Sequence, residues 1–135
     1  MVALEAATIS ADEAAAALAD PKVKASLLDL ALRVASDAGV AQPAKVLAVA
    51  AADHQVAETL LSGDIINDHA PVYVIEVTGG RFTAQDHQPR EVPAPQGDVL
   101  TITVDAATLR VTDIGFVDVE PDLSALGPTV DLSSP

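Results

Sequence analysis

The stretch DVLTITVDAATLRVTDIGFVDV, residues 98–119, decides the fold class. Its first part alternates apolar residues with threonines, in the order Leu100, Thr101, Ile102, Thr103 and Val104. This alternation predicts a half-buried strand with its threonines facing solvent. The segment 105–108, DAAT, predicts a turn, because Asp and Thr side chains hydrogen-bond to nearby backbone. The apolar phase then slips at Asp113–Ile114, which predicts a bulge in a second, antiparallel strand.

A further strand is predicted upstream, over VYVIEVTGGRFTA, residues 72–84. Tyr73, Ile75 and Val77 occupy one side of it, and the residues between them occupy the other. The pair Gly79–Gly80 predicts a bend, after which Phe82 returns to the core side.

Two helices are predicted near the N-terminus. Ser10 followed by Glu13 is a capping-box pattern and predicts a helix over 11–19. Asp20 and Pro21 are typical of the cap and first position of a second helix, which Gly39 ends. The two helices could also form one helix that is kinked at Pro21.

A weaker strand and a third helix lie between these regions. The segment 44–51 predicts the strand, and Asp53 predicts the cap of a helix that runs to Ser62. Val56, Leu60 and Leu61 are expected to face the core.

These patterns predict a single α+β domain over residues 1–135. We expect N-terminal helices packed on one face of a curved antiparallel sheet of about four strands. The segment 1–9 and the tail 121–135 are expected to be flexible or to contact a partner. Helical residues 122–126 precede an extended end that could pack on the sheet or reach a neighbour.

The composition of the chain disfavours or excludes several classes of function. There are 20 acidic residues against 7 basic ones, and the net charge is −13, so binding to nucleic acid or to an anionic membrane is disfavoured. The absence of cysteine excludes thiol catalysis and disulfides. No run of apolar residues is long enough to span a bilayer, and residues 1–10 lack the pattern of a signal peptide. We expect a secreted or envelope-associated mature protein, with the cytoplasm as the alternative.

The succession of a helix, VYVIEV and the hairpin VDAATLRV resembles the PepSY-like modules of exported bacterial proteins, and small cystatin-like folds. The chain is also similar to uncharacterised actinobacterial proteins that share the VDAAT hairpin and the PDLSALG ending, residues 121–127. The resemblance implies a helix packed on an antiparallel sheet and a regulatory, protein-binding role, for example restraint of a protease. Leu109 departs from the glycine of that pattern, so either the turn or the strand pairing is expected to differ.

Three sets of residues are candidates for a metal-binding or catalytic site. The histidines His54, His69 and His87 lie in different segments and would have to converge in space to bind a metal. The loop 64–69 offers oxygen ligands, but without the spacing of a calcium loop. The acidic residues near the end could form a catalytic pair, although the chain lacks the aromatic residues that bind sugars; they are Asp113, Asp118, Glu120 and Asp122.

These observations predict a non-catalytic protein-binding module without a metal or cofactor, which presents its loops or a sheet edge to another protein. The expected contacts lie in the loop 85–97 and in the tail, at Gln85, Asp86, His87, Gln88, Pro89, Arg90, Pro93, Pro95, Leu123 and Leu126. One alternative is a structural subunit that self-assembles through strand addition by a terminal segment. The other is a small-ligand-binding domain with a pocket between helix and sheet, for which the sequence offers no convergent polar set.

Overall fold

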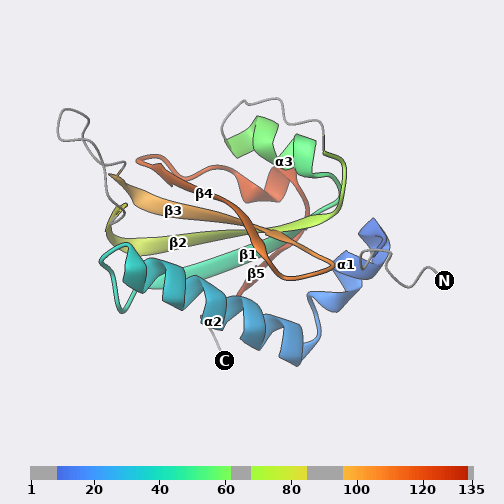
Figure 1. Ribbon diagram of the computed structural model, residues 1–135, viewed down its shortest axis with the longest axis horizontal. Coiled ribbons are helices and arrows are strands. Elements are labelled where there is room, and N and C mark those ends of the chain that lie inside the picture. The colour runs from blue at the N-terminus through green and yellow to red at the C-terminus, as the bar shows by residue number, and fades with distance from the viewer. Residues whose placement is uncertain (1–8, 62–67, 85–95, 134–135) are drawn as a thin grey trace.

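Five antiparallel strands form one open sheet that carries helices on both faces (Figure 1). The computed structural model describes residues 9–61, 68–84 and 96–133. The elements in chain order are α1 (Ala11–Ala17), α2 (Pro21–Asp37), β1 (Lys45–Ala51), α3 (His54–Leu61), β2 (Val72–Thr83), β3 (Gln96–Asp105), β4 (Val111–Val117), η1 (Leu123–Ala125) and β5 (Thr129–Asp131). The strand order is β4-β3-β2-β1-β5. The α+β class is therefore confirmed, with a fifth strand added.

Both N-terminal helices begin at the cap residues that the sequence predicts. The Ser10 hydroxyl accepts from Glu13 N at 3.0 Å, and the Glu13 carboxylate accepts from Ser10 N at 2.9 Å, so the capping box is complete. Asp20 accepts from Lys22 N at 2.9 Å, and Pro21 begins α2. The chain therefore forms two helices rather than one kinked helix.

The helices α1 and α2 cover one face of the sheet, as predicted (Figure 1). The core between these helices and the sheet is built mainly from aliphatic residues, and Leu27 and Ala31 of α2 are fully buried. Tyr73 is also buried, and its hydroxyl donates to Ala14 O at 2.8 Å. The remaining large members of this core are Leu18, Leu30, Val46, Ile75, Val77, Phe82, Leu100, Ile102, Val104 and Leu132.

The opposite face is covered by α3 and η1, and here two expectations were wrong. Val56 is 55% exposed, whereas His54, Ala57 and Glu58 are the buried residues of α3. Thr101 and Thr103 are buried as well, at 5% and 1% exposed. The reason is that α3 lies over the strand face on which the threonines stand, so a polar alternation did not mark a solvent-facing side.

Both predicted irregularities in the strands are present. The register between β2 and β3 shifts between Thr78 and Phe82, and Gly79 has a φ of 102°. No residue with a side chain could replace Gly79 without a clash, because a Cβ atom at this position would lie 2.3 Å from Ala44 N. In β4 the register shifts so that Thr112 is the extra residue, one position before the predicted slip. The bulge places Val111 and Ile114 on the same side of β4.

The turn between β3 and β4 keeps Leu109 in the left-handed region, with φ at 59°. The side chain of Asp105 organises this turn, because its Oδ1 accepts from Ala107 N at 2.8 Å and from Thr108 N at 3.1 Å. Leu109 therefore takes the conformation that glycine would favour, rather than changing the turn to avoid it. This conformation costs a residue with a side chain about 1–2 kcal/mol.

The C-terminal segment packs back onto the sheet. The strand β5 pairs with β1, and Leu132 is buried and donates its amide to Val46 O at 2.7 Å. Of the two terminal segments singled out in the sequence, residues 1–8 and 134–135 lie outside the described part of the chain.

Candidate functional site

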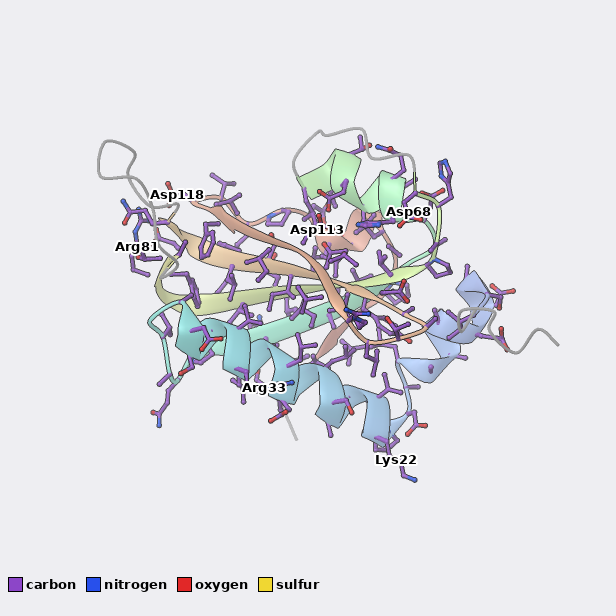
Figure 2. The ribbon with its side chains drawn as sticks, in the orientation of Figure 1. Lys22, Arg33, Asp68, Arg81, Asp113 and Asp118 are labelled. Atoms are coloured by element: carbon purple, nitrogen blue, oxygen red, sulfur yellow. The ribbon has the colours of Figure 1, made fainter. Side chains whose placement is uncertain are left out.

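A group of polar side chains is enclosed between α3 and the sheet. His54 is 6% exposed, and its two ring nitrogens each meet a carboxylate. Nδ1 lies 2.7 Å from Asp68 Oδ2, and Nε2 lies 2.7 Å from Asp113 Oδ2. Figure 2 shows Asp68 and Asp113 on the α3 side of the sheet. Residues from three separate segments thus meet at one imidazole.

The first turn of α3 fixes the histidine. Asp53 caps the helix, accepting from Gln55 N at 2.8 Å, and its second carboxylate oxygen lies 2.8 Å from His69 Nδ1. The segment that carries Asp68 is held against the same turn, because His54 N donates to Ala70 O at 2.9 Å and Gln55 N donates to Asp68 O at 2.8 Å. These backbone contacts fix Asp68 beside Nδ1 of the histidine.

The bulge in β4 fixes the other carboxylate. Asp113 pairs with Thr103 across the β3–β4 ladder, on the face that α3 covers. The hydroxyl of Thr112, the extra residue, lies 2.8 Å from Asp113 Oδ2 and 3.2 Å from Thr103 O. The strand irregularity therefore sets the position of the carboxylate that faces His54 Nε2.

The two carboxylates favour the charged imidazole. Burial disfavours imidazolium, but the hydrogen bonds to Asp68 and Asp113 outweigh burial and raise the pKa of His54. The hydrogen bond from His54 lowers the pKa of Asp68 in turn. At Asp53 burial disfavours the carboxylate, but the hydrogen bonds from His69 and from the backbone of Val56 and Gln55 together outweigh burial and lower the pKa of the carboxyl.

A third acid joins this group from α3. Glu58 lies one helical turn after His54, and the ligand atoms of His54, Glu58 and Asp113 all lie within 4.8 Å of one another. A cavity of about 400 Å³ opens beside them, with Thr101 and Thr103 in its wall. The sequence showed no convergent polar set between helix and sheet, and that expectation was wrong. The imidazole and the two carboxylates are ligands of the kind that hold transition-metal ions.

Glu76 extends the polar layer along β2. It is 4% exposed, and its Oε1 has no hydrogen-bond partner in the described part of the chain. Burial, together with a hydrogen bond to the Glu120 carboxyl, raises the pKa of Glu76 to about 7. The five buried polar or charged residues within 9–61, 68–84 and 96–133 all stand on the face that α3 covers, namely His54, Glu58, Glu76, Thr101 and Thr103.

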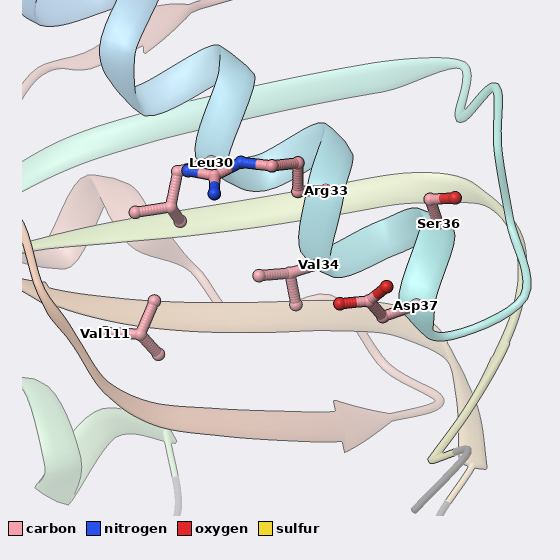
Figure 3. Close-up of a pocket in the computed structure, with 6 residues that line it drawn as sticks. All are labelled: Leu30, Arg33, Val34, Ser36, Asp37 and Val111. Atoms are coloured by element: carbon pink, nitrogen blue, oxygen red, sulfur yellow. The ribbon is translucent and has the colours of Figure 1, made fainter.

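A second feature, a groove with a mixed apolar and polar lining, lies between α2 and β4 on the opposite face (Figure 3). Three apolar and three polar residues line it, namely Leu30, Val34, Val111, Arg33, Ser36 and Asp37. Its volume is about 340 Å³. Figure 3 shows Leu30, Val34 and Val111 pointing into the space between the helix and the strand.

The strand beside this groove is an edge strand. Within the described ranges, β4 pairs with β3 alone. Three of the five exposed large hydrophobic residues there belong to β4 or lie two residues beyond it: Val111 at 37%, Ile114 at 49% and Val119 at 79%. The edge therefore combines unpaired backbone groups with exposed apolar side chains.

The predicted contact residues lie elsewhere. Gln85, Asp86, His87, Gln88, Pro89, Arg90, Pro93 and Pro95 lie outside the described residues. Leu123 is buried and Leu126 is half-buried, and both pack on the core beneath α3 and η1. Neither leucine stands free on the surface, and their predicted role in partner binding stays a prediction.

The other candidate sets separate in the structure. Asp113 contacts His54, while Asp118 contacts Arg81 at 2.6 Å, at the other end of the sheet in Figure 2. Glu120 contacts Glu76, and Asp122 caps η1. In the loop 64–69, Asp64 and Asn67 lie outside the described residues, and Asp68 and His69 contact His54 and Asp53.

One signal in the sequence could have revealed the polar site. His54, Ala57, Glu58 and Leu61 recur at i, i+3, i+4 and i+7, which is the spacing of a single helix face. The spacing of apolar residues alone predicts Val56 as a core-facing residue instead. The meeting with Asp113 depends on the β3–β4 register and carries no local signal.

Comparisons with protein-family models, with curated proteins and with solved structures find no match. The findings support an α+β chain with N-terminal helices and a five-stranded antiparallel sheet, and the narrower family resemblance stays a prediction. Among the described residues, no helix has both the length and the apolar character needed to cross a membrane.

Proposed function

We propose that this protein is a non-catalytic binding module that receives an extended, cationic segment of another protein along the edge of β4. The observation that carries this proposal is a β4 edge that no other strand of the described residues pairs with, together with two exposed apolar side chains on one side of it. Val111 lines the α2 groove, and Ile114 lies on the same side of β4. An added strand would pair with the β4 backbone and place alternate side chains against the groove.

Charge supports the choice of partner. The chain carries a net charge of −13, so a basic segment is attracted and an acidic one is repelled. The same charge opposes association between two copies of this chain, and so opposes the self-assembling alternative, in which a terminal segment adds a strand to a neighbour. The resemblance to PepSY-like modules adds a finer proposal, an extracytoplasmic regulatory role in which the bound segment belongs to a protease or another exported protein.

A synthetic peptide as long as β4, with alternating Lys and Val, tests the binding proposal in the full chain. Fluorescence anisotropy should show saturable binding of this peptide and none of a peptide with alternating Asp and Val. Ile114→Lys should weaken binding at least about tenfold, which corresponds to about 1.4 kcal/mol.

Val56→Lys is the matched control, since it adds the same charge to an exposed apolar residue on α3. Equal losses in both variants would reduce the effect to general electrostatics and contradict the proposal. Sedimentation at low and high salt tests the self-assembling alternative, which requires association that tightens as salt screens the charge.

A further inference from the structure

The polar layer under α3 has chemistry that the β4 edge does not use. Asp113 and Ile114 are neighbours in β4, and successive residues of a strand point to opposite faces. Asp113 therefore faces α3, while Ile114 stands on the side of the α2 groove. The two faces of β4 therefore present different side chains, although Ile114 also lines the cavity beside Asp113.

From the convergence of one imidazole and two carboxylates beside a cavity, we propose that His54, Glu58 and Asp113 bind a divalent first-row transition-metal ion such as Zn²⁺ or Mn²⁺. His54 and Glu58 reach the same point because residues four apart lie on one face of a helix. Asp113 reaches it from the sheet, with its carboxylate held beside the Thr112 hydroxyl.

The orientation of the histidine is the arrangement that metal-binding histidines use. Asp68 accepts from Nδ1, which leaves Nε2 directed at Asp113. Ligating histidines almost always donate their second ring nitrogen to a carboxylate or carbonyl, which fixes the tautomer and makes the ligating nitrogen more basic. Asp68 is thus a positioning residue, and it does not touch the ion.

The distances require only a small adjustment. Two ligand atoms on a tetrahedral ion with bonds of about 2.0–2.2 Å lie about 3.3 Å apart. His54 Nε2 and Asp113 Oδ2, now 2.7 Å apart, would separate slightly as the ion replaces the shared proton. The remaining separations, up to 4.8 Å, would close by about one to two ångströms, which side-chain rotation of Glu58 can supply.

The donor set and its surroundings select the class of ion. Ca²⁺ takes six to eight oxygen ligands, whereas imidazole with carboxylate suits Zn²⁺, Mn²⁺ and Fe²⁺. His54 and Glu58 are buried, and the neighbouring cavity leaves room for water or a small ligand at the open coordination positions. The charge of a divalent ion would also offset the carboxylates that converge here.

Calorimetric titration of the full chain with Zn²⁺, and separately with Mn²⁺, tests the site in buffer with enough salt to screen the acidic surface. One ion should bind per chain. Asp113→Asn and His54→Gln should each raise Kd by at least about 100-fold, and Asp68→Asn by about 10–100-fold. Asp118→Asn is the matched control, because it removes an exposed carboxylate just beyond the other end of β4 and should leave Kd unchanged.

Nitrogen NMR of the imidazole rings in the unsubstituted chain keeps the test decisive even if a variant fails to fold. Zn²⁺ should shift the Nε2 signal of His54 and leave the rings of His69 and His87 unchanged. The proposal is wrong if no saturable binding occurs, if Asp118→Asn weakens binding as much as Asp113→Asn, or if the His54 ring does not respond.

Discussion

The two faces of the sheet are built in opposite ways. The face under α1 and α2 is packed with aliphatic residues around Leu27 and Ile75. The face under α3 holds all five of the buried polar or charged residues in the described part of the chain. Burying such groups costs free energy unless each is fully satisfied, so the first face is organised for stability, and the second is the face on which we propose binding chemistry.

The largest expected effect is on the aliphatic face. Leu27→Ala should lower the free energy of unfolding by about 2–5 kcal/mol, because it opens a cavity in a fully buried site. Leu32→Ala, on the same helix at 37% exposed, is the control and should cost less than about 1 kcal/mol. Urea denaturation measures both variants. Similar losses in the two would show that α2 does not pack as described.

On the α3 face, substitution of a buried residue is expected to raise the free energy of unfolding rather than lower it. The pKa of Glu76 is raised from 4.5 to about 7 in the folded state, so between those values the folded chain holds a proton that the unfolded chain has lost. The stability of the unsubstituted protein should therefore fall as pH rises through this window and then level off.

Glu76→Gln removes this pH dependence, since the amide does not titrate. The variant should gain on the unsubstituted chain by up to roughly 3 kcal/mol between pH 4.5 and pH 8. Urea denaturation across this range measures the difference. A variant that is less stable than the original at pH 8 would mean that the Glu76 carboxylate is well satisfied in the fold.

A smaller effect is expected in the turn that joins β3 to β4. Leu109 has a φ of 59°, which glycine adopts without strain and other residues do not. Leu109→Gly should therefore be more stable than Leu109→Ala by about 1 kcal/mol, although both lose the leucine side chain. Thermal unfolding of the pair measures this difference. If the alanine variant were the more stable, the turn would have another conformation.

The sequence predicted the features that depend on local chemistry. The capping box at Ser10 and the cap at Asp20 follow from side chains that act on neighbouring backbone, and the bulge near Asp113 follows from a slip in the local apolar alternation. The α3 face was mispredicted because its buried side is polar, so that hydrophobic spacing favoured Val56. The contact between His54 and Asp113 spans 59 residues and depends on strand register, which no short pattern specifies.

The edge proposed to bind a partner was predictable only in general terms. A sheet edge was named as one possible contact, but the spacing of Val111 and Ile114 on one side of β4 requires the extra residue Thr112. Which strand lies at the edge follows from the order β4-β3-β2-β1-β5, and this order depends on long-range pairing.

Mapping the alternating Lys and Val peptide onto the isotope-labelled full chain tests the central claim most directly. We predict that amide NMR shifts concentrate in residues 111–117 of β4 and 30–37 of α2, and that they spare α3. Shifts confined to the loop 85–97, or spread evenly over the acidic surface, would contradict the assignment of β4 as the binding edge.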